Sequence, residues 1–142
     1  MGDKIVVLEE LFHNERGYMP LVLTRDWQVA QLNYAPSQSP ENLRMLDQHT
    51  FTDETFILIQ GRAVLITYNE KTKERALTSL KWGHTYNVPV MMWHNIAMEE
   101  NSVVMIMESR DAHIKGLRQI FLPDKVKKEI LEYTKEMWNS TF

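Results

Sequence analysis

Residues 49–61 read HTFTDETFILIQG, and the apolar run in the second half of this stretch decides the fold. The run is short and rich in β-branched and aromatic residues, which is typical of a β-strand. In a strand, Phe56 and Leu58 point to one face, while Ile57 and Ile59 point to the other. A strand that is apolar on both faces needs cover on both, from a second sheet, a helix or another subunit.

Further short apolar runs of this kind extend along the chain on both sides, with turn signals between them. The sequence predicts strands at Ile5–Leu8, Leu21–Thr24, Trp27–Leu32, Leu43–Leu46, Thr55–Ile59, Ala63–Tyr68, Arg75–Leu80, His94–Met98 and Val103–Met107. Gln60-Gly61 separates two of these runs at the spacing of a hairpin. Such even spacing indicates an all-β sandwich or barrel rather than alternating strands and helices.

One helix is predicted, at the C-terminal end. Pro123-Asp124 is a start signal. After it, Val126, Ile130 and Met137 fall on one face at helical period, with Tyr133 or Thr134 between them. We expect a helix over about 124–138 that caps a sheet; binding to a membrane or a partner is the alternative.

Composition narrows the class of protein. The chain has 142 residues, which predicts a single domain over 1–142, with the barrel core at about 19–109. It has no cysteine, so disulfides, thiolate metal sites and Cys nucleophiles are excluded. A net charge of -3 argues against nucleic-acid binding. No apolar run is long enough to span a membrane or to form a signal peptide, so we expect a cytoplasmic protein.

The alternation of side chains between the two faces of a strand also predicts a metal-binding site. If residues 45–49 are extended, Asp47 and His49 point the same way. His94 shares a face with Ile96 and Met98, which are most economically inside. The two imidazoles and the Glu54 carboxylate can then converge in one pocket, as a ligand set suited to Fe, Mn, Ni or Zn.

The same residues carry a family resemblance. Residues 49–61 resemble the first motif of the cupin superfamily, with four residues between His49 and Glu54 and six between Glu54 and Gly61. Residues 83–94, which read GHTYNVPVMMWH, resemble the second motif, and His94 stands where that motif has its His.

The resemblance covers roughly residues 40–108 and implies a double-stranded β-helix, the RmlC-like jelly roll, with a site in the barrel mouth. It implies Asp47, His49, Glu54 and His94 as the metal ligands, although Asp47 replaces the usual first His of the motif. Other histidines lie outside the ligand positions: we expect His84 to be exposed, and His13 and His113 to lie on the surface.

Three functions remain open at this stage. The first is a metal-dependent enzyme acting on a small oxygenated metabolite, of isomerase or oxygenase type, with His49 and His94 in the chemistry. The second resembles metal-free sugar epimerases: His49, oriented by Asp47, is the base, and Tyr68 or Tyr86 is the acid. The third is a non-catalytic protein that binds a small molecule. A homodimer is expected, since dimers are the commonest oligomer.

Overall fold

Ten strands and one long helix form the part of the chain that the structure, a computed structural model, describes, namely residues 6–139. In chain order they are β1 (Gly17–Leu23), β2 (Trp27–Asn33), β3 (Met45–His49), β4 (Glu54–Gln60), β5 (Ala63–Tyr68), β6 (Arg75–Ser79), β7 (Thr85–Val88), β8 (Trp93–Met98), β9 (Val103–Ser109), β10 (Leu117–Phe121) and α1 (Asp124–Asn139). A short 3-10 helix, Pro36–Gln38, follows β2.

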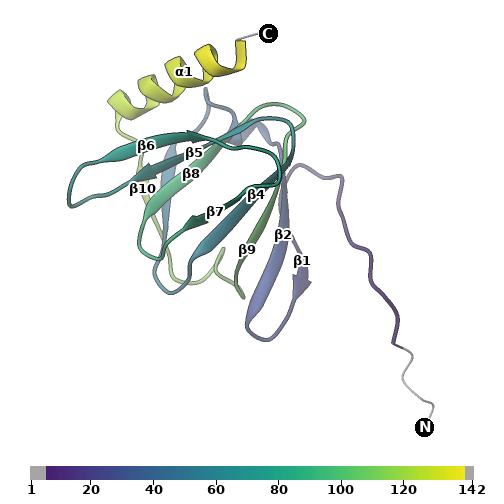
Figure 1. Cartoon of the computed structure of the whole chain (residues 1–142). Helices are drawn as coiled ribbons and strands as arrows, with labels where there is room; N and C mark the ends of the chain where they lie inside the picture. Colours follow the sequence, from purple (N-terminus) through teal and green to yellow (C-terminus); the bar gives the residue numbers. More distant parts are fainter. Residues whose placement is uncertain (1–5, 140–142) are drawn as a thin grey trace.

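The strands form two five-stranded antiparallel sheets that face each other (Figure 1). Sheet A has the order β1-β2-β9-β4-β7, and sheet B has the order β10-β3-β8-β5-β6. Neighbours in each sheet are mostly distant in sequence, as in a jelly roll. The expected all-β barrel with a C-terminal helix is confirmed.

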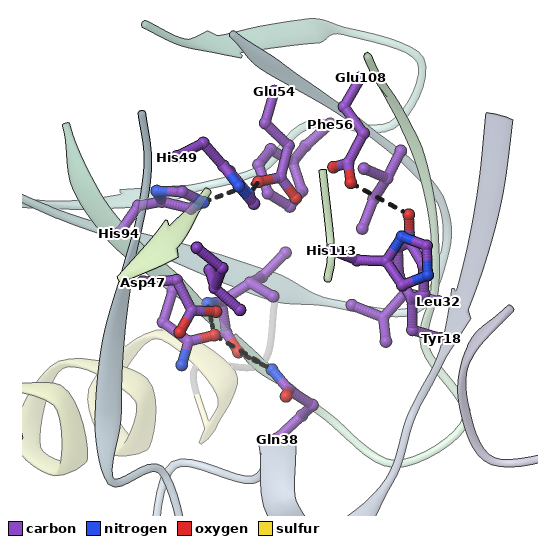
Figure 2. A pocket seen from close by; sticks show the side chains of 14 residues that line it. Tyr18, Leu32, Gln38, Asp47, His49, Glu54, Phe56, His94, Glu108 and His113 are labelled. Atoms are coloured by element: carbon purple, nitrogen blue, oxygen red, sulfur yellow. Dashed lines mark hydrogen bonds and ion pairs between the residues drawn. The ribbon is translucent and has the colours of Figure 1, made fainter. Parts of the chain in front are cut away.

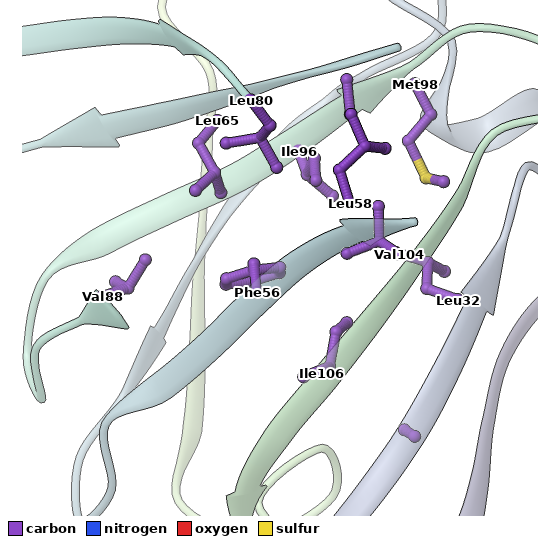
Figure 3. Close-up of a cluster of buried hydrophobic side chains, with 12 residues drawn as sticks. Leu32, Phe56, Leu58, Leu65, Leu80, Val88, Ile96, Met98, Val104 and Ile106 are labelled. Carbon is purple, nitrogen blue, oxygen red and sulfur yellow. The ribbon is translucent and has the colours of Figure 1, made fainter. Parts of the chain in front are cut away.

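The space between the sheets is filled by the inward residues of each strand (Figure 3). On sheet A, Phe56 lies opposite Ile106 and Leu58 lies opposite Val104. All four side chains are buried, and residues of sheet B complete the cluster from the other side. Period-2 alternation therefore assigns these residues to the core, as the sequence predicted.

The helix α1 lies over sheet B (Figure 1). Val126, Ile130 and Thr134 are its buried residues, and the first two join a cluster with Ile66 and Trp93 of the sheet. The predicted helix is confirmed, with Thr134 at the buried position, but Met137, expected on the same face, is exposed. No helix among residues 6–139 has the length and apolarity needed to cross a membrane.

The turn after β4 requires a glycine. Gly61 has a φ of +78°, and a Cβ there would lie 2.3 Å from Ser102 Oγ and 2.7 Å from Ser102 Cα. Only glycine fits this close approach in a left-handed conformation. Gly61 thereby allows β4 of sheet A to turn tightly into β5 of sheet B. The hairpin expected at Gln60-Gly61 was wrong, because these two strands belong to different sheets and do not pair.

Several predicted boundaries were wrong. Residues 6–8 form no strand, and Ile5 lies outside the described residues. The strand expected at Leu43–Leu46 lies at Met45–His49 instead, because Leu43 packs beneath α1. Two strands, β7 and β10, were not predicted, because their many polar residues hide any apolar run. Since β10 pairs with β3, sheet B extends beyond the barrel limits expected at about 19–109. That the whole chain is one domain stays a prediction.

Candidate functional site

Three side chains from both sheets converge between them (Figure 2). Glu54 begins β4 in sheet A, while His49 and His94 belong to β3 and β8 in sheet B. Glu54 Oε2 lies 2.5 Å from His49 Nε2 and 2.9 Å from His94 Nε2. All three residues are buried, and one ligand atom of each lies within 4.8 Å of the others. This confirms the convergence predicted from strand alternation.

The local register explains why these side chains meet. His94 precedes Ile96 and Met98 on the inward face of β8, and both of these are core residues. β3 pairs with β8 in a register that sets Asp47 opposite His94. His49, two residues further along β3, therefore also faces inward, at the end of the strand.

The hydrogen bond on the far side of the His94 ring determines its tautomer. His94 Nδ1 lies 3.0 Å from the Met92 carbonyl oxygen, which can only accept, so Nδ1 carries a proton. His94 Nε2 then either carries a second proton, which it donates to Glu54, or has a free lone pair. A lone pair oriented in this way is the arrangement that metal-ligating histidines use.

The pKa values of the three groups are linked. Burial by itself would raise the pKa of Glu54, but hydrogen bonds from His49 and His94 outweigh it and hold the pKa well below the usual range. Burial by itself would lower the pKa of both imidazoles. Their hydrogen bonds to Glu54, together with its charge, outweigh burial, so the pKa of each imidazole is raised. Glu54 is therefore a carboxylate at neutral pH, as a ligand or a partner of imidazolium must be.

Asp47 lies in the same pocket but outside this converging group. Its Oδ1 accepts a hydrogen bond of 2.9 Å from Gln119 Nε2, on the neighbouring strand β10. Burial raises the pKa of Asp47, and Gln119 and His94 partly offset that effect. The structure thus brings together three of the four residues expected as ligands, while Gln119 holds the fourth at the pocket wall.

A second polar group, which sequence reasoning missed, lines the same pocket and adjoins the first where Glu108 lies beside Glu54 (Figure 2). Tyr18 OH donates a hydrogen bond of 3.2 Å to Glu108 Oε1 and accepts one of 2.7 Å from Gln28 Nε2. Gln28 Oε1 accepts from the Asp111 backbone N–H, so its Nε2 is the end that faces His113 Nδ1, 3.0 Å away. This chain of contacts fixes the orientation of Glu108.

Glu108 holds its proton more tightly than an ordinary carboxyl. Burial, and next the negative charge of Glu54, raise the pKa of Glu108 to about 8. Its Oε2 is buried and has no hydrogen-bond partner in the described part of the chain. Burial also raises the pKa of Tyr18, with the charge of Glu108 adding to the effect. The pocket thus holds the anionic carboxylate of Glu54 next to a carboxyl, Glu108, that keeps its proton.

The pocket itself is a cavity of about 300 Å³. Its remaining lining includes apolar residues from strands of both sheets: Leu32, Phe56, Ile96, Ile106 and Leu117. Phe56 packs edge-on against the His94 ring, with 5.9 Å between the centroids. A cavity of this size suits a small metabolite with polar groups at two ends.

The other candidate residues lie elsewhere. Tyr86 accepts a hydrogen bond from the Lys81 backbone N–H at 2.9 Å and stacks on His84, and it does not line the pocket. Tyr68 packs in the cluster beneath α1. Neither expected proton donor therefore lines the pocket: Tyr86 packs against the core cluster between the sheets, and Tyr68 packs on the other side of sheet B.

The remaining histidines give one confirmed prediction and two wrong ones. His84 is exposed, as expected. His13 is buried rather than on the surface, because its ring packs on β2 and hydrogen-bonds the Gln31 carbonyl. His113 is half-buried and lines the pocket, since the loop after β9 turns it inward beside Tyr18.

Two residues of the second polar group, Gln28 and Glu108, could have been assigned to the inside of the barrel from the sequence pattern. Gln28 alternates with Ala30 and Leu32, which are core residues, so it shares their inward face. Glu108 follows Ile106 by two residues, and extending that predicted strand beyond Met107 would have placed it inside. Nothing in the pattern around His113 indicates its position, because it lies in a loop.

No model of a protein family and no curated protein matches the sequence. Solved structures do. A cupin-2 domain containing protein from Shewanella frigidimarina is 20% identical with a TM-score of 0.51, covering 70% of this chain and 85% of that one. A protein from Bacillus halodurans is 15% identical with a TM-score of 0.56, covering 82% and 84%.

A longer protein shares the fold in part. CapF from Staphylococcus aureus, a capsular polysaccharide assembling protein, is 19% identical with a TM-score of 0.56. The match covers 75% of this chain but only 32% of CapF. At these identities the likeness concerns the fold, and the chemistry has to be argued from the site.

Proposed function

The chain has the cupin fold, and from this premise we propose that it is a metal-dependent enzyme acting on a small oxygenated metabolite, by isomerase- or oxygenase-type chemistry. His49, Glu54 and His94 would hold a divalent cation. The observation that carries the proposal is the convergence of two imidazole nitrogens and one carboxylate oxygen, all buried, within 4.8 Å of one another.

The donor set fits such an ion. Two imidazoles and one carboxylate leave coordination positions open, and they suit Fe, Mn, Ni or Zn. The Met92 carbonyl fixes the ring of His94 with Nε2 toward the site, as an outer-shell partner of a ligand does. Asp47 lines the same pocket, and its carboxylate adds negative charge, which favours a cation.

When bound, the cation would polarise a carbonyl or hydroxyl oxygen of the substrate. The chain's own residues supply the rest of the chemistry. Glu108 retains a proton close to neutral pH and can transfer it at its carboxyl oxygen, while Tyr18 and Gln28 hold that carboxyl in place. Phe56 and Ile106 line the cavity and keep water from the reacting groups.

Metal analysis of the purified protein tests the proposal. We expect about one ion per chain, and a loss of affinity of at least on the order of 100-fold in His49→Ala and in His94→Ala, because removing a ligand costs more than removing an outer-shell partner. His84→Ala, an exposed histidine outside the site, is the matched control and should keep its ion. Protein that takes up no Fe, Mn, Ni or Zn, or that keeps its ion in both ligand variants, would contradict the proposal.

A metal-free acid–base enzyme is the second candidate, and the contact between His49 and Glu54 favours it. Glu54 would take the orienting role expected of Asp47, and Tyr18 would take the acid role expected of Tyr68 or Tyr86. The polysaccharide assembly named for CapF supports a sugar-derived substrate in this case. Turnover of a sugar that persists after complete metal removal would favour this reading. Binding without any turnover would favour the third possibility, a non-catalytic small-molecule binder.

A further inference from the structure

The outer face of sheet B carries a second cavity, separate from the pocket between the sheets. The helix α1 covers part of this face (Figure 1), and beside it lies a cavity of about 400 Å³. Of the residues that the structure describes, none lines both this cavity and the pocket that contains Glu54. A cavity of this volume is large enough for a small organic molecule.

Strand pairing forms a row of side chains along this cavity. Arg118 of β10 lies opposite Gln48 of β3, and Trp93 of β8 lies opposite Tyr68 of β5. The antiparallel pairing of β3 with β8 puts Gln48 beside Trp93, and all four side chains line the cavity. Gln48 and Trp93 each directly precede a candidate metal ligand, so their side chains point to the opposite face of the sheet.

The guanidinium of Arg118 is held in one orientation within this row. Its Nη1 donates a hydrogen bond of 3.1 Å to Gln48 Oε1, and its Cζ lies 5.7 Å from the centre of the Trp93 ring, in a cation–π contact. Gln48 is itself buried, and its Nε2 donates a hydrogen bond of 2.8 Å to the Met91 carbonyl oxygen. A buried amide and a buried indole therefore both hold the cation in place.

Most of the hydrogen-bonding capacity of Arg118 is unused. A guanidinium carries N–H donors on all of its nitrogens, and Gln48 engages Nη1. Within residues 6–139, no carboxylate forms an ion pair with Arg118 or with Lys71, which lines the same cavity. Glu70, the acidic residue of the lining, instead accepts a hydrogen bond of 3.0 Å from Trp93 Nε1. The cavity therefore has an excess of positive charge and a guanidinium ready to bind an anion.

The loop between β7 and β8 gives the cavity an apolar side. Its residues 89–92 all line the cavity, and Val90 and Met91 are 41% and 49% exposed. Met91 has a φ of +74°, a left-handed conformation that is uncommon for a bulky residue. Its N–H donates to the His49 carbonyl oxygen at 2.8 Å, which together with the bond from Gln48 holds this backbone in place. Residues held in such conformations are concentrated at ligand-binding sites, and methionine side chains adapt readily to the shape of a ligand.

We propose that this cavity is a second binding site, which takes a small carboxylic acid with an apolar body. The planar fork of the Arg118 guanidinium matches the two oxygens of a carboxylate, and its unused N–H groups donate to them. The apolar body lies against Val90 and Met91 and removes their exposed surface from water. The Glu70 carboxylate disfavours a ligand with more than one negative charge, such as a phosphate ester. The site lies on the other face of sheet B from the candidate metal ligands, so it does not depend on a metal.

Isothermal titration calorimetry of the full chain with benzoate and with isovalerate tests the site. We expect saturable binding of each acid. Benzamide has the shape of benzoate without its charge, and Arg118→Met removes the guanidinium. Each change should weaken binding by about 10-fold or more, because a hydrogen bond between charged groups is stronger than one between neutral groups. Arg25→Met, which replaces an exposed arginine outside the cavity, is the matched control and should bind benzoate as the natural chain does.

The Arg118 variant also distinguishes the two cavities. Benzoate that binds between the sheets would bind equally well to the natural chain and to Arg118→Met, since Arg118 lies on the other face of sheet B. Arg118 is exposed, so we expect an unchanged unfolding midpoint in this variant. The comparison of benzoate with benzamide uses the natural chain and does not depend on the variant. Equal affinity of the two chains for benzoate, equal affinity of the natural chain for benzoate and benzamide, or no binding of either acid at millimolar concentration would overturn the proposal.

Discussion

Glu54 and Glu108 lie opposite each other on neighbouring strands of sheet A, and their surroundings drive their pKa values apart. Two imidazoles next to Glu54 stabilise its charge, so its pKa falls below the usual range. Glu108 is buried beside that charge, which His49 only partly offsets, and its pKa rises to about 8. A pair of carboxyls whose pKa values differ in this way can provide one anion and one acid in the same cavity.

This separation predicts how the stability of the metal-free protein depends on pH. Between about 4.5 and about 8 the folded state holds a proton on Glu108 that the unfolded state has lost, so stability falls as pH rises through this interval. The raised pKa values of His49 and His94 act in the same direction: their contribution to stability is complete below the ordinary histidine pKa of 6.5 and is lost as pH rises through the raised pKa of the folded state. Glu54 acts oppositely, and its contribution is lost only as pH falls below 4.5.

Urea denaturation across this range measures the effect. Glu108→Gln keeps the shape but cannot ionise, so the loss of stability from pH 5 to pH 8 should become smaller by about 1 kcal/mol or more, since one pKa unit corresponds to 1.36 kcal/mol. Glu100→Gln, at an exposed position, should leave the pH profile unchanged. A profile for Glu108→Gln identical to that of the natural protein would show that Glu108 is not protonated as argued here.

Among the elements, α1 is one that the local sequence pattern was sufficient to predict. Its start signal and its apolar period are both in the sequence, and burial on one face of sheet B adds the tertiary contribution. An ion pair between Arg75 of β6 and Glu129 of α1 lies at the edge of this contact. Because that pair is partly exposed, the apolar contact should dominate the stability of the helix.

Substitutions at two neighbouring helix positions, one buried and one exposed, measure how much the apolar contact contributes to stability. Ile130→Ala removes a buried side chain from the cluster beneath α1 and should destabilise the protein by about 2–5 kcal/mol. Leu131→Ala, one residue further and exposed, should cost less than about 0.5 kcal/mol. Thermal or urea unfolding of the two variants compares them directly. Equal losses would mean that α1 does not depend on its contact with sheet B.

At the scale of the whole molecule, the candidate metal ligands come from different sheets. Glu54 belongs to sheet A, while His49 and His94 belong to sheet B. A cation at this position would therefore connect the two halves of the barrel, and its binding free energy would add to the free energy of unfolding.

Thermal unfolding with and without metal measures this link. At a free metal concentration 100 times the dissociation constant, stability should rise by about 2.7 kcal/mol, with a corresponding increase in Tm. A chelator should reverse the increase, and His94→Ala should abolish it, whereas His84→Ala should retain it. A melting temperature that does not respond to Fe, Mn, Ni or Zn would contradict a metal held between the sheets.

The sequence by itself determined the strand alternation, and with it the inward face of most strands. His94 was placed correctly because Ile96 and Met98 show which face of its strand is buried. His49 was placed only on the assumption that residues 45–49 are extended, because its neighbours Met45 and Asp47 do not show which face is buried. Glu54 was placed by its spacing from His49 and Gly61. Where polar residues hide the pattern, as in β7 and β10, the same reasoning had no signal.

Only the tertiary structure decided which side chains meet across the barrel. Tyr18, Glu108 and His113 come from the two ends of the chain and from a loop, and no local pattern relates them to Glu54. Asp47 was expected as a ligand, yet its partner Gln119 lies on a strand that the sequence did not reveal. Alternation is a property of one strand, whereas a site depends on the register between strands, and that register is set by contacts between residues far apart in the chain.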